Sequence, residues 1–284
     1  MTARGGVTPG FPDLGGLAVA RRPFWGRWIA AAAVLTALGL ILKAFAEGQI
    51  EWSYVARFLT APTILSGIVN TVVMAVLAMA LGTVLGIVVA LMRLSQNPVL
   101  VACAAGYTWL FRGTPLILQL LLWFNIALIF PTIGLPGIWS APAVEVMTPF
   151  VSALLGLGLN QGAYTSEVIR AGIISVDEGQ HDAARAIGMG RLTALRRVVL
   201  PQAMKVVLPP LGNEFISMIK TTSLASVIQF PEVLHSAQNI YYANSRVIEL
   251  LIVAGFWYLA VVSVLTPVQM LLERHFSRGS GRTR

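Results

Sequence analysis

The sequence predicts an all-α polytopic membrane protein, on the evidence of its composition, its long apolar segments and the placement of its basic residues. Of the 284 residues, 56% are hydrophobic and only 11% are charged, and the mean hydropathy is +0.76. A soluble domain carries roughly 25% charged residues. A chain with this much apolar surface cannot bury it in a small core, so most of the chain must lie in lipid. The composition therefore excludes a cytosolic enzyme and a secreted domain.

The first apolar segment runs from about Trp28 to Phe45 and follows three arginines, Arg21, Arg22 and Arg27. It has nearly the 20 residues or so that a helix needs to cross a bilayer. We expect a spanning helix, and a cleaved signal peptide is the alternative because Ala44-Phe45-Ala46 resembles a small-residue cleavage site. Both interpretations place the chain that follows on the outer side.

Further apolar segments are each long enough to cross a bilayer with some tilt. If all of them span, six crossings in total place the two termini on the same side of the membrane. The five later spans are expected at Ile64 to Leu91, Thr108 to Phe130, Phe150 to Ile174, Pro201 to Leu224 and Val247 to Leu272.

The basic residues indicate the orientation of these spans. The chain has 20 Lys and Arg residues and a net charge of +8. Most of them fall in the N-terminal tail, after the second span, in the loop between the fourth and fifth spans, or in the C-terminal tail. The positive-inside rule then places both termini and that long loop in the cytoplasm. We therefore attribute the excess of positive charge to membrane topology and expect no nucleic-acid partner.

The long cytoplasmic loop, at about residues 175–203, has a pattern that a membrane anchor alone does not need. Alanines and good helix formers follow Asp182 and end at Gly188 and Gly190, which predicts a short helix. Small residues on this helix allow close approach to another surface, and the arginines behind it favour the anionic inner leaflet. The sequence predicts a docking helix, and a re-entry loop that lies on the membrane is the alternative.

Polar residues at bilayer depth are the candidates for a substrate path, because they are costly in lipid and face a partner or a cavity. The fourth span contains Asn160, Gln161, Tyr164 and Glu167, and the spacing of 160, 164 and 167 places these three on one helical face. This stripe is suited to binding an amino acid. The alternative is a hydrogen-bonded seam between helices, with Glu167 paired to Arg170.

The fifth span contains Pro209-Pro210, which removes two backbone donors and predicts a kink or a break before Leu211. A new helix N-terminus at this depth attracts anions, so Asn213 and Glu214 join the candidate path. Proline kinks also serve packing alone, and Glu214 is equally suited to bridging two helices. In the second span, the spacing of Gly82 and Gly86 favours helix packing.

Several motifs carry a resemblance to a known family. The loop helix, followed by Arg196-Arg197-Val198-Val199-Leu200-Pro201-Gln202-Ala203, resembles the EAA motif of the membrane subunits of bacterial binding-protein-dependent ABC importers. Three further motifs are similar to the polar amino acid uptake branch of that family. They are Arg112-Gly113-Thr114-Pro115-Leu116, the run from Ala163 to Arg170, and Gly212-Asn213-Glu214-Phe215 leading to Lys220-Thr221-Thr222-Ser223-Leu224.

The resemblance covers about residues 60–275 and implies the five-helix permease core of a type I importer. Residues 1–50 then form a tail and an extra transmembrane helix, and residues 276–284 form a basic cytoplasmic tail. The EAA glutamate is Asp182 here, for which we expect weaker contact rather than lost docking. The resemblance implies that the docking helix contacts an ATPase through Asp182, Ala183, Ala184, Ile187, Gly188, Met189 and Gly190.

The family resemblance also implies partners. The sequence has no phosphate-binding loop and no Gly-Lys pair, so this chain cannot power transport by itself. It implies a dimer of cytoplasmic ATP-binding subunits, which hold the ATP and Mg, and no cofactor in this chain. It further implies a second permease, either a copy of this chain or a sister chain, a periplasmic substrate-binding protein, membrane lipid and an amino acid substrate. The expected location is the bacterial inner membrane.

Two other functional classes remain as alternatives. An ion-coupled secondary amino acid carrier also uses intramembrane carboxylates such as Glu167 and Glu214, but carriers show two related halves, and this chain has no visible repeat. An enzyme needs a convergent catalytic set. The three histidines are scattered, neither HExxH nor CxxC occurs, and the single Cys103 permits no cysteine metal cluster. We therefore predict that the chain is not an enzyme and has no catalytic or metal-ligating residues.

Overall fold

The computed structural model describes residues 25–135 and 137–276, which fall into two compact units, Met1–Ile50 and Glu51–Arg284. The described part of the first unit is helix α1 (Trp25–Glu47), none of whose residues is buried. Its surface is apolar around the whole helix, as expected for a helix that lies in lipid. The predicted helix from Trp28 to Phe45 is confirmed, whereas the predictions for residues 1–24 and for the basic tail from 277 onward lie outside the described residues.

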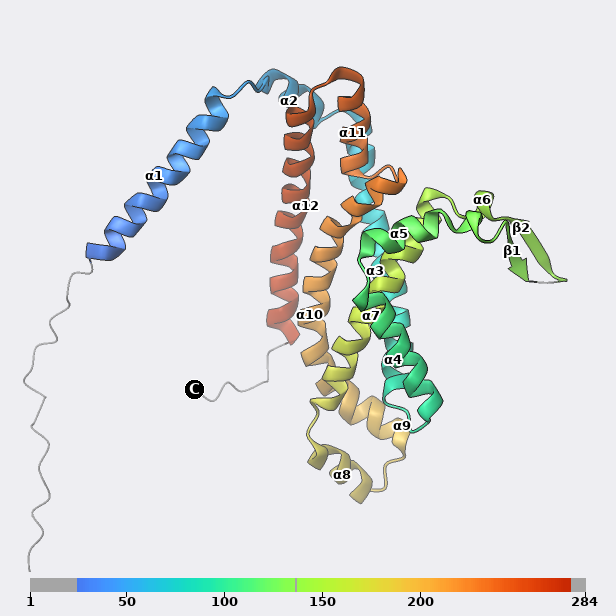
Figure 1. The fold of residues 1–284 in the computed structure, drawn as a ribbon. Helices are drawn as coiled ribbons and strands as arrows, with labels where there is room; N and C mark the ends of the chain where they lie inside the picture. Colours follow the sequence, from blue (N-terminus) through green and yellow to red (C-terminus); the bar gives the residue numbers. More distant parts are fainter. Residues whose placement is uncertain (1–24, 136, 277–284) are drawn as a thin grey trace, which may run out of the picture. The chain divides into compact units, whose positions relative to one another are not determined.

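The second unit is a helix bundle with short helices at both ends (Figure 1). Its long helices are α3 (Pro62–Arg93), α7 (Pro149–Ile174), α10 (Leu200–Thr221) and α12 (Val247–Phe276). Figure 1 shows α8 (Glu178–Ala186) and α9 (Arg191–Ala194) at one end, and α2 (Trp52–Leu59) and α11 (Val233–Asn244) at the other. Shorter elements complete it: α4 (Pro98–Gly113), α5 (Leu116–Phe124), η1 (Ile126–Leu128), α6 (Ala143–Val146), the π-helical turn η2 (Leu195–Val199) and the 3₁₀ helix η3 (Thr222–Ile228).

Each expected span contains helix in the structure. By length and hydropathy alone, three helices qualify as membrane-crossing among the residues described, namely Trp25–Glu47, Pro62–Arg93 and Val247–Arg274. Helices α7 and α10 are more polar, but their 26 and 22 residues reach about 39 and 33 Å at 1.5 Å per residue, which is enough to cross the bilayer core.

The expected third span, Thr108 to Phe130, is not one helix, and this prediction is wrong. Helix α4 ends at Gly113, Thr114 is extended, and α5 begins at Leu116 after Pro115. Proline disfavours helical geometry in the residue before it and fits the first turn of a new helix, which explains the break. After α5 the chain forms an antiparallel hairpin of β1 (Thr132–Leu135) and β2 (Trp139–Pro142), with Leu135 paired to Trp139.

Of the kink or break expected in the fifth span, the break does not occur. Helix α10 runs without interruption from Leu200 to Thr221 and contains both Pro209 and Pro210. Prolines are tolerated inside membrane helices when neighbouring groups compensate for the lost backbone hydrogen bonds. Since the helix continues through this region, it has no new N-terminus at Gly212 or Asn213 to attract an anion.

The most extensive packing in the bundle is between α3 and α7, and it depends on glycines. A Cβ atom at Gly82 would lie 2.6 Å from Cγ of Gln161, and one at Gly86 would lie 2.7 Å from Cγ2 of Thr165. Lipid supplies no hydrophobic force between helices, so association depends on close packing and hydrogen bonds. The predicted packing role of the two glycines is confirmed, and they bring polar residues of α7 against α3.

Beside this contact, buried side chains from several helices form the core of the bundle. Alanines supply much of it, which keeps the helices close together. The cluster comprises Met74, Ala75, Ala78, Leu120, Ala153, Leu157, Met218, Ile219, Ala225, Ile228 and Phe230.

A buried carboxylate fixes the end of the bundle near α11. Glu232 is fully buried and caps α11, accepting hydrogen bonds from the backbone N–H groups of Leu234 at 2.8 Å and His235 at 2.6 Å. The Tyr258 hydroxyl of α12 donates to the same carboxylate, and the N–H of Val233 donates to Thr71 Oγ1 of α3 at 3.2 Å. These bonds join α3, α11 and α12.

We predict that Gly86→Leu destabilises the protein by about 1–3 kcal/mol, because the added side chain overlaps Thr165 and forces α3 away from α7. Thermal unfolding of the purified protein in detergent measures the effect. Gly106→Leu is the matched control, since a Cβ at Gly106 meets nothing within 4 Å. Equal melting temperatures for the two variants would contradict this account of the packing.

Candidate functional site

A polar cavity of about 340 Å³ lies between α5, α7 and α10. It brings together four of the six predicted path residues, which come from two separate spans. Its lining consists of Leu116, Leu157, Asn160, Gln161, Tyr164, Glu214, Ser217, Met218 and Thr221. Glu214 is the one charged side chain among these nine residues, so the cavity offers a negative charge beside hydroxyl and amide groups.

Two residues of α7 hold the Glu214 carboxylate in place. Gln161 Nε2 donates to Glu214 Oε2 at 2.7 Å, and Thr165 Oγ1 donates to the same oxygen at 3.1 Å. Among the described residues, none donates a hydrogen bond to Oε1 of Glu214, and Glu214 lines the cavity. The arrangement is both a bridge between helices, as the alternative interpretation expected, and a positioned acceptor for a cationic group.

Asn160 helps to close the break between α4 and α5. Pro115 has no N–H, so the carbonyl of Phe111 has no ordinary helical partner. Asn160 Nδ2 donates to this carbonyl at 2.8 Å, and Gln119 Nε2 donates to it at 2.9 Å. The amide nitrogen of Asn160 is therefore used in a seam between helices. Sequence reasoning missed Gln119, although a buried amide four residues after a helix-breaking proline is the signal for such a bond.

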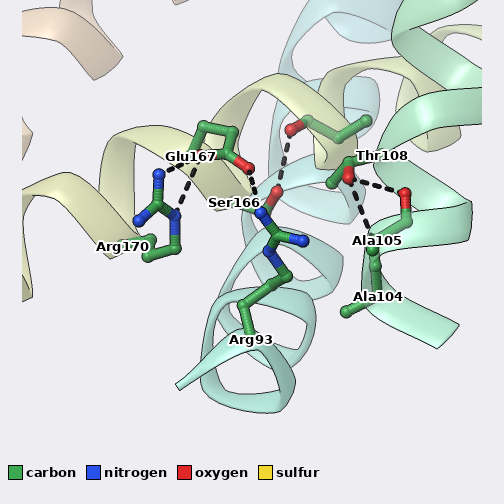
Figure 2. A network of polar contacts seen from close by, with 8 residues as sticks. Arg93, Ala104, Ala105, Thr108, Ser166, Glu167 and Arg170 are labelled. Atoms are coloured by element: carbon green, nitrogen blue, oxygen red, sulfur yellow. Dashed lines mark hydrogen bonds and ion pairs between the residues drawn. The ribbon is translucent and has the colours of Figure 1, made fainter. Parts of the chain in front are cut away.

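Glu167 lies apart from the first cavity, in an ion-pair cluster (Figure 2). Its carboxylate is 2.7 Å from Arg170 Nη2 and 3.8 Å from Arg93 Nη2, and all three side chains are partly buried. The pairing with Arg170 that the alternative interpretation expected is present. The cluster joins α3 to α7 and borders a second cavity of about 520 Å³.

Asn213 is not brought into the cavity. It is exposed, and its amide nitrogen lies 3.4 Å from the carbonyl oxygen of Pro209 on the same helix. Its neighbour Gly212 packs on Gln269 of α12, where a Cβ would lie 2.9 Å from Cγ. Because α10 is continuous, residue 213 falls on a different face from residue 214, which turns toward α7.

The predicted docking helix exists as α8, but it begins earlier than expected. Asp177 is the N-cap, and its side chain accepts a hydrogen bond from the N–H of Gly179 at 2.8 Å. Asp182 lies within the helix instead of at its start, and it pairs with Arg185 at 3.5 Å on the exposed surface. Helix α8 also packs on η2 and α9, which holds it against the later part of the loop.

Gly188 terminates α8 in a Schellman motif. The N–H of Gly188 bonds to the carbonyl of Arg185 at 2.9 Å, and the N–H of Met189 bonds to the carbonyl of Ala184 at 3.0 Å. Gly188 has φ +76, a conformation that glycine adopts at little cost, and a Cβ there meets nothing within 4 Å. Its requirement for glycine is therefore conformational within this chain, whereas the sequence indicated a need for close approach.

The exposed face of α8 differs in one residue from the predicted contact set. Ala184 is only 3% exposed, so it faces the fold, and its expected place on a contact surface is wrong. Ala183, Gly188 and Gly190 are exposed, and Ile187 is 72% exposed. An isoleucine this exposed at the end of a polar helix is suited to burial by another protein. Among the described residues, no group of three His, Cys, Asp or Glu side chains is placed to hold a metal ion.

A family model with the description "binding-protein-dependent transport system inner membrane component" matches residues 82–278. The chain belongs to this family. The match covers the part of the bundle that contains both cavities and the α8 loop. The family assignment agrees with the expectation from the motifs and makes the chain a membrane component of a transport system.

Several relatives of the chain have names that specify the transport of an amino acid. The arginine transport system permease protein ArgU of Corynebacterium glutamicum is 40% identical over 261 residues, which is 91% of this chain and 82% of the relative. The L-cystine transport system permease protein TcyB of Bacillus subtilis is 39% identical and covers 76% of this chain and 88% of the relative.

Solved structures show the same fold. A chain in the crystal structure of an amino acid ABC transporter with histidines has a TM-score of 0.66 and 36% identity, covering 75% of this chain and 94% of its own length. A chain of the MetNI methionine ABC transporter in an inward facing conformation has a TM-score of 0.61 at 15% identity, covering 76% of this chain and 97% of its own length. The expected type I importer permease fold is confirmed.

We predict that Asn160→Asp lowers stability by about 1–3 kcal/mol in the absence of substrate, because a partly buried donor to the Phe111 carbonyl is replaced by an oxygen. Thermal unfolding of the solubilised protein measures the change. Asn125→Asp is the control, since its amide makes a local and exposed bond to Leu121 at 2.8 Å. An Asn160 variant as stable as the Asn125 variant would sink the seam interpretation.

Proposed function

We propose that this chain is the permease subunit of an ATP-driven amino acid importer and that the cavity between α7 and α10 is part of its substrate path. The observation that most supports this proposal is the Glu214 carboxylate. Gln161 and Thr165 position it in a cavity that Asn160 and Tyr164 also line. An ionisable side chain held in this way within a membrane-spanning helix marks a substrate pathway in many membrane proteins. The amino acid names carried by the relatives support the substrate class.

The charge of the cavity favours a substrate with a cationic group. Its lining residues include one carboxylate and neither Lys nor Arg. An ammonium or guanidinium group forms a strong, charge-assisted hydrogen bond with such a carboxylate. A relative named as an arginine permease, at 40% identity, supports a basic amino acid such as arginine as the first substrate to test.

The proposed orientation places α8 and both termini in the cytoplasm, because the basic residues of the chain concentrate there. In this arrangement α8 contacts a dimer of ATP-binding subunits, which bind the ATP and Mg. A periplasmic substrate-binding protein delivers the amino acid on the opposite face, and a second permease completes the path. Of the predicted contact residues, the exposed ones remain in this proposal: Asp182, Ala183, Ile187, Gly188 and Gly190, with the half-buried Met189 beside them.

The connections of the α8 loop support its role in coupling. The loop joins the end of α7 to the start of α10, and these are the helices that flank the cavity. Val176, Val199 and Ala203 form a buried cluster that fixes the loop to both helices. Gly172 of α7 packs directly on Val207 of α10, where a Cβ would lie 2.2 Å from Cγ2. Displacement of α8 by the ATPase would therefore shift α7 and α10 as rigid bodies.

We predict that Glu214→Gln raises the apparent KM for arginine uptake about tenfold or more, since hydrogen bonds to a charged group contribute roughly 1.5–3 kcal/mol. Uptake of radiolabelled arginine into proteoliposomes that contain the assembled complex measures the change. Glu145→Gln removes an exposed carboxylate on α6 and should leave KM unaltered. A normal KM in the Glu214 variant, at normal membrane levels, would place the path elsewhere.

We predict that Ile187→Cys forms a crosslink to the ATP-binding subunit through a bifunctional thiol reagent, whereas Ala184→Cys does not. The reason is exposure, which is 72% at Ile187 and 3% at Ala184, only three residues away. Replacement of Cys103 by serine in both variants removes the native thiol. Denaturing electrophoresis detects the crosslinked product. Crosslinking at Ala184 in preference to Ile187 would reverse the proposed contact face.

A further inference from the structure

Tyr164 lies between two cavities of opposite charge. It lines the substrate cavity together with Glu214, and it also lines the second cavity together with Arg93, Arg112, Trp109 and others. Along α7, residues 157–161 border the first cavity and residue 167 borders the second. In the orientation proposed above, the second cavity therefore lies on the cytoplasmic side of the first.

Arg112 holds the Tyr164 ring in this position. The guanidinium carbon of Arg112 is 5.2 Å from the centroid of the ring, which is the geometry of a cation–π contact. Within the described ranges, Arg112 has no carboxylate inside 4.0 Å, whereas Arg93 and Arg170 both pair with Glu167, as Figure 2 shows. Arg112 is thus the cation of this cavity whose charge is not compensated by a direct ion pair.

The charges of the two cavities match the two ends of an amino acid. The first cavity presents the Glu214 carboxylate, which attracts a cationic group. The second presents Arg93 and Arg112 against a single carboxylate, Glu167, so it has an excess of positive charge that attracts a carboxylate. Its volume of about 520 Å³ exceeds the 340 Å³ of the first cavity, so it has room for a substrate that leaves the first.

We propose that Tyr164, held against Arg112, is the inner barrier of the substrate cavity and that the arginine-lined cavity is the exit chamber that receives the substrate carboxylate. This inference rests on the proposed function, because it assumes that substrate passes the Glu214 cavity. Release then requires the Tyr164 ring to turn away from Arg112. Residue Tyr164 is 43% exposed, so the fold leaves space for that rotation, and the freed guanidinium becomes available to the carboxylate.

Thiol accessibility tests the barrier in the assembled complex, in inside-out membrane vesicles without nucleotide. Ser217→Cys places a reporter in the substrate cavity, and Cys103→Ser removes the native thiol. The probe is the anionic, membrane-impermeant reagent sulfonatoethyl methanethiosulfonate, added from the cytoplasmic side. We expect Tyr164→Ala to accelerate labelling about tenfold, because the barrier is removed, and Tyr164→Phe to change it less than twofold, because the ring remains.

A second readout separates an exit chamber from a simple structural wall. With the cationic reagent trimethylammonioethyl methanethiosulfonate as the comparison, we expect Arg112→Gln to lower the ratio of anionic to cationic labelling rates several-fold. Thr193→Cys, an exposed position on α9, is the access control, and its labelling rates should be the same in every background. Unchanged rates in Tyr164→Ala overturn the barrier, and an unchanged ratio in Arg112→Gln overturns the chamber.

Substrate protection distinguishes failure of this inference from failure of the proposed function. Saturating L-arginine should slow labelling of the Ser217→Cys reporter when the Glu214 cavity binds substrate. Protection with no effect of the Tyr164 and Arg112 variants rejects the barrier and the chamber but supports the path. Absence of protection by arginine and by the other proteinogenic amino acids rejects the path, and the barrier with it.

Discussion

The close contact between α3 and α7 is the constraint on which the polar interior depends. In lipid, a buried donor or acceptor finds a partner only within the protein, and helices associate through packing and hydrogen bonds. Gly82 and Gly86 remove the side chains that would separate the two helices, so Gln161 and Thr165 lie against α3. From that position they reach Glu214 on α10. A larger residue at either glycine therefore disturbs the carboxylate two helices away.

The same helices connect the polar cavity to the exposed surface of the protein. The loop that contains α8 begins at the end of α7 and returns into α10, and its buried cluster ties both helices together. Force applied to α8 is therefore transmitted to the two walls of one cavity, to α7 directly and to α10 through α9 and η2. Local interactions set the two ends of α8, since Asp177 caps its start and Gly188 ends it.

The sequence predicted the parts of the fold and site that depend on periodicity, and failed where two local rules competed. The helical spacing predicted Asn160, Tyr164 and Glu167 on one face, and the structure brings Asn160 and Tyr164 to one cavity but places Glu167 at the second cavity. Predictions at prolines were wrong in two opposite ways. The third span is interrupted at Pro115, where a new helix starts, whereas Pro209 and Pro210 stay inside one continuous helix. Tertiary packing decides between these outcomes. Likewise, small size at Ala184 is compatible with either face of α8, and only the register of the helix shows that it faces inward.

A high-resolution structure of the assembled complex with L-arginine bound is the most direct test of the proposed substrate path. The proposed path predicts ligand density between α7 and α10 in that structure. A ligand nitrogen should lie about 2.7–2.9 Å from a Glu214 oxygen, as in charge-assisted hydrogen bonds. Asn160 should keep its bond to the Phe111 carbonyl in that complex. Arginine bound in the membrane region at another face, with Glu214 contacted only by Gln161 and Thr165, would contradict the path.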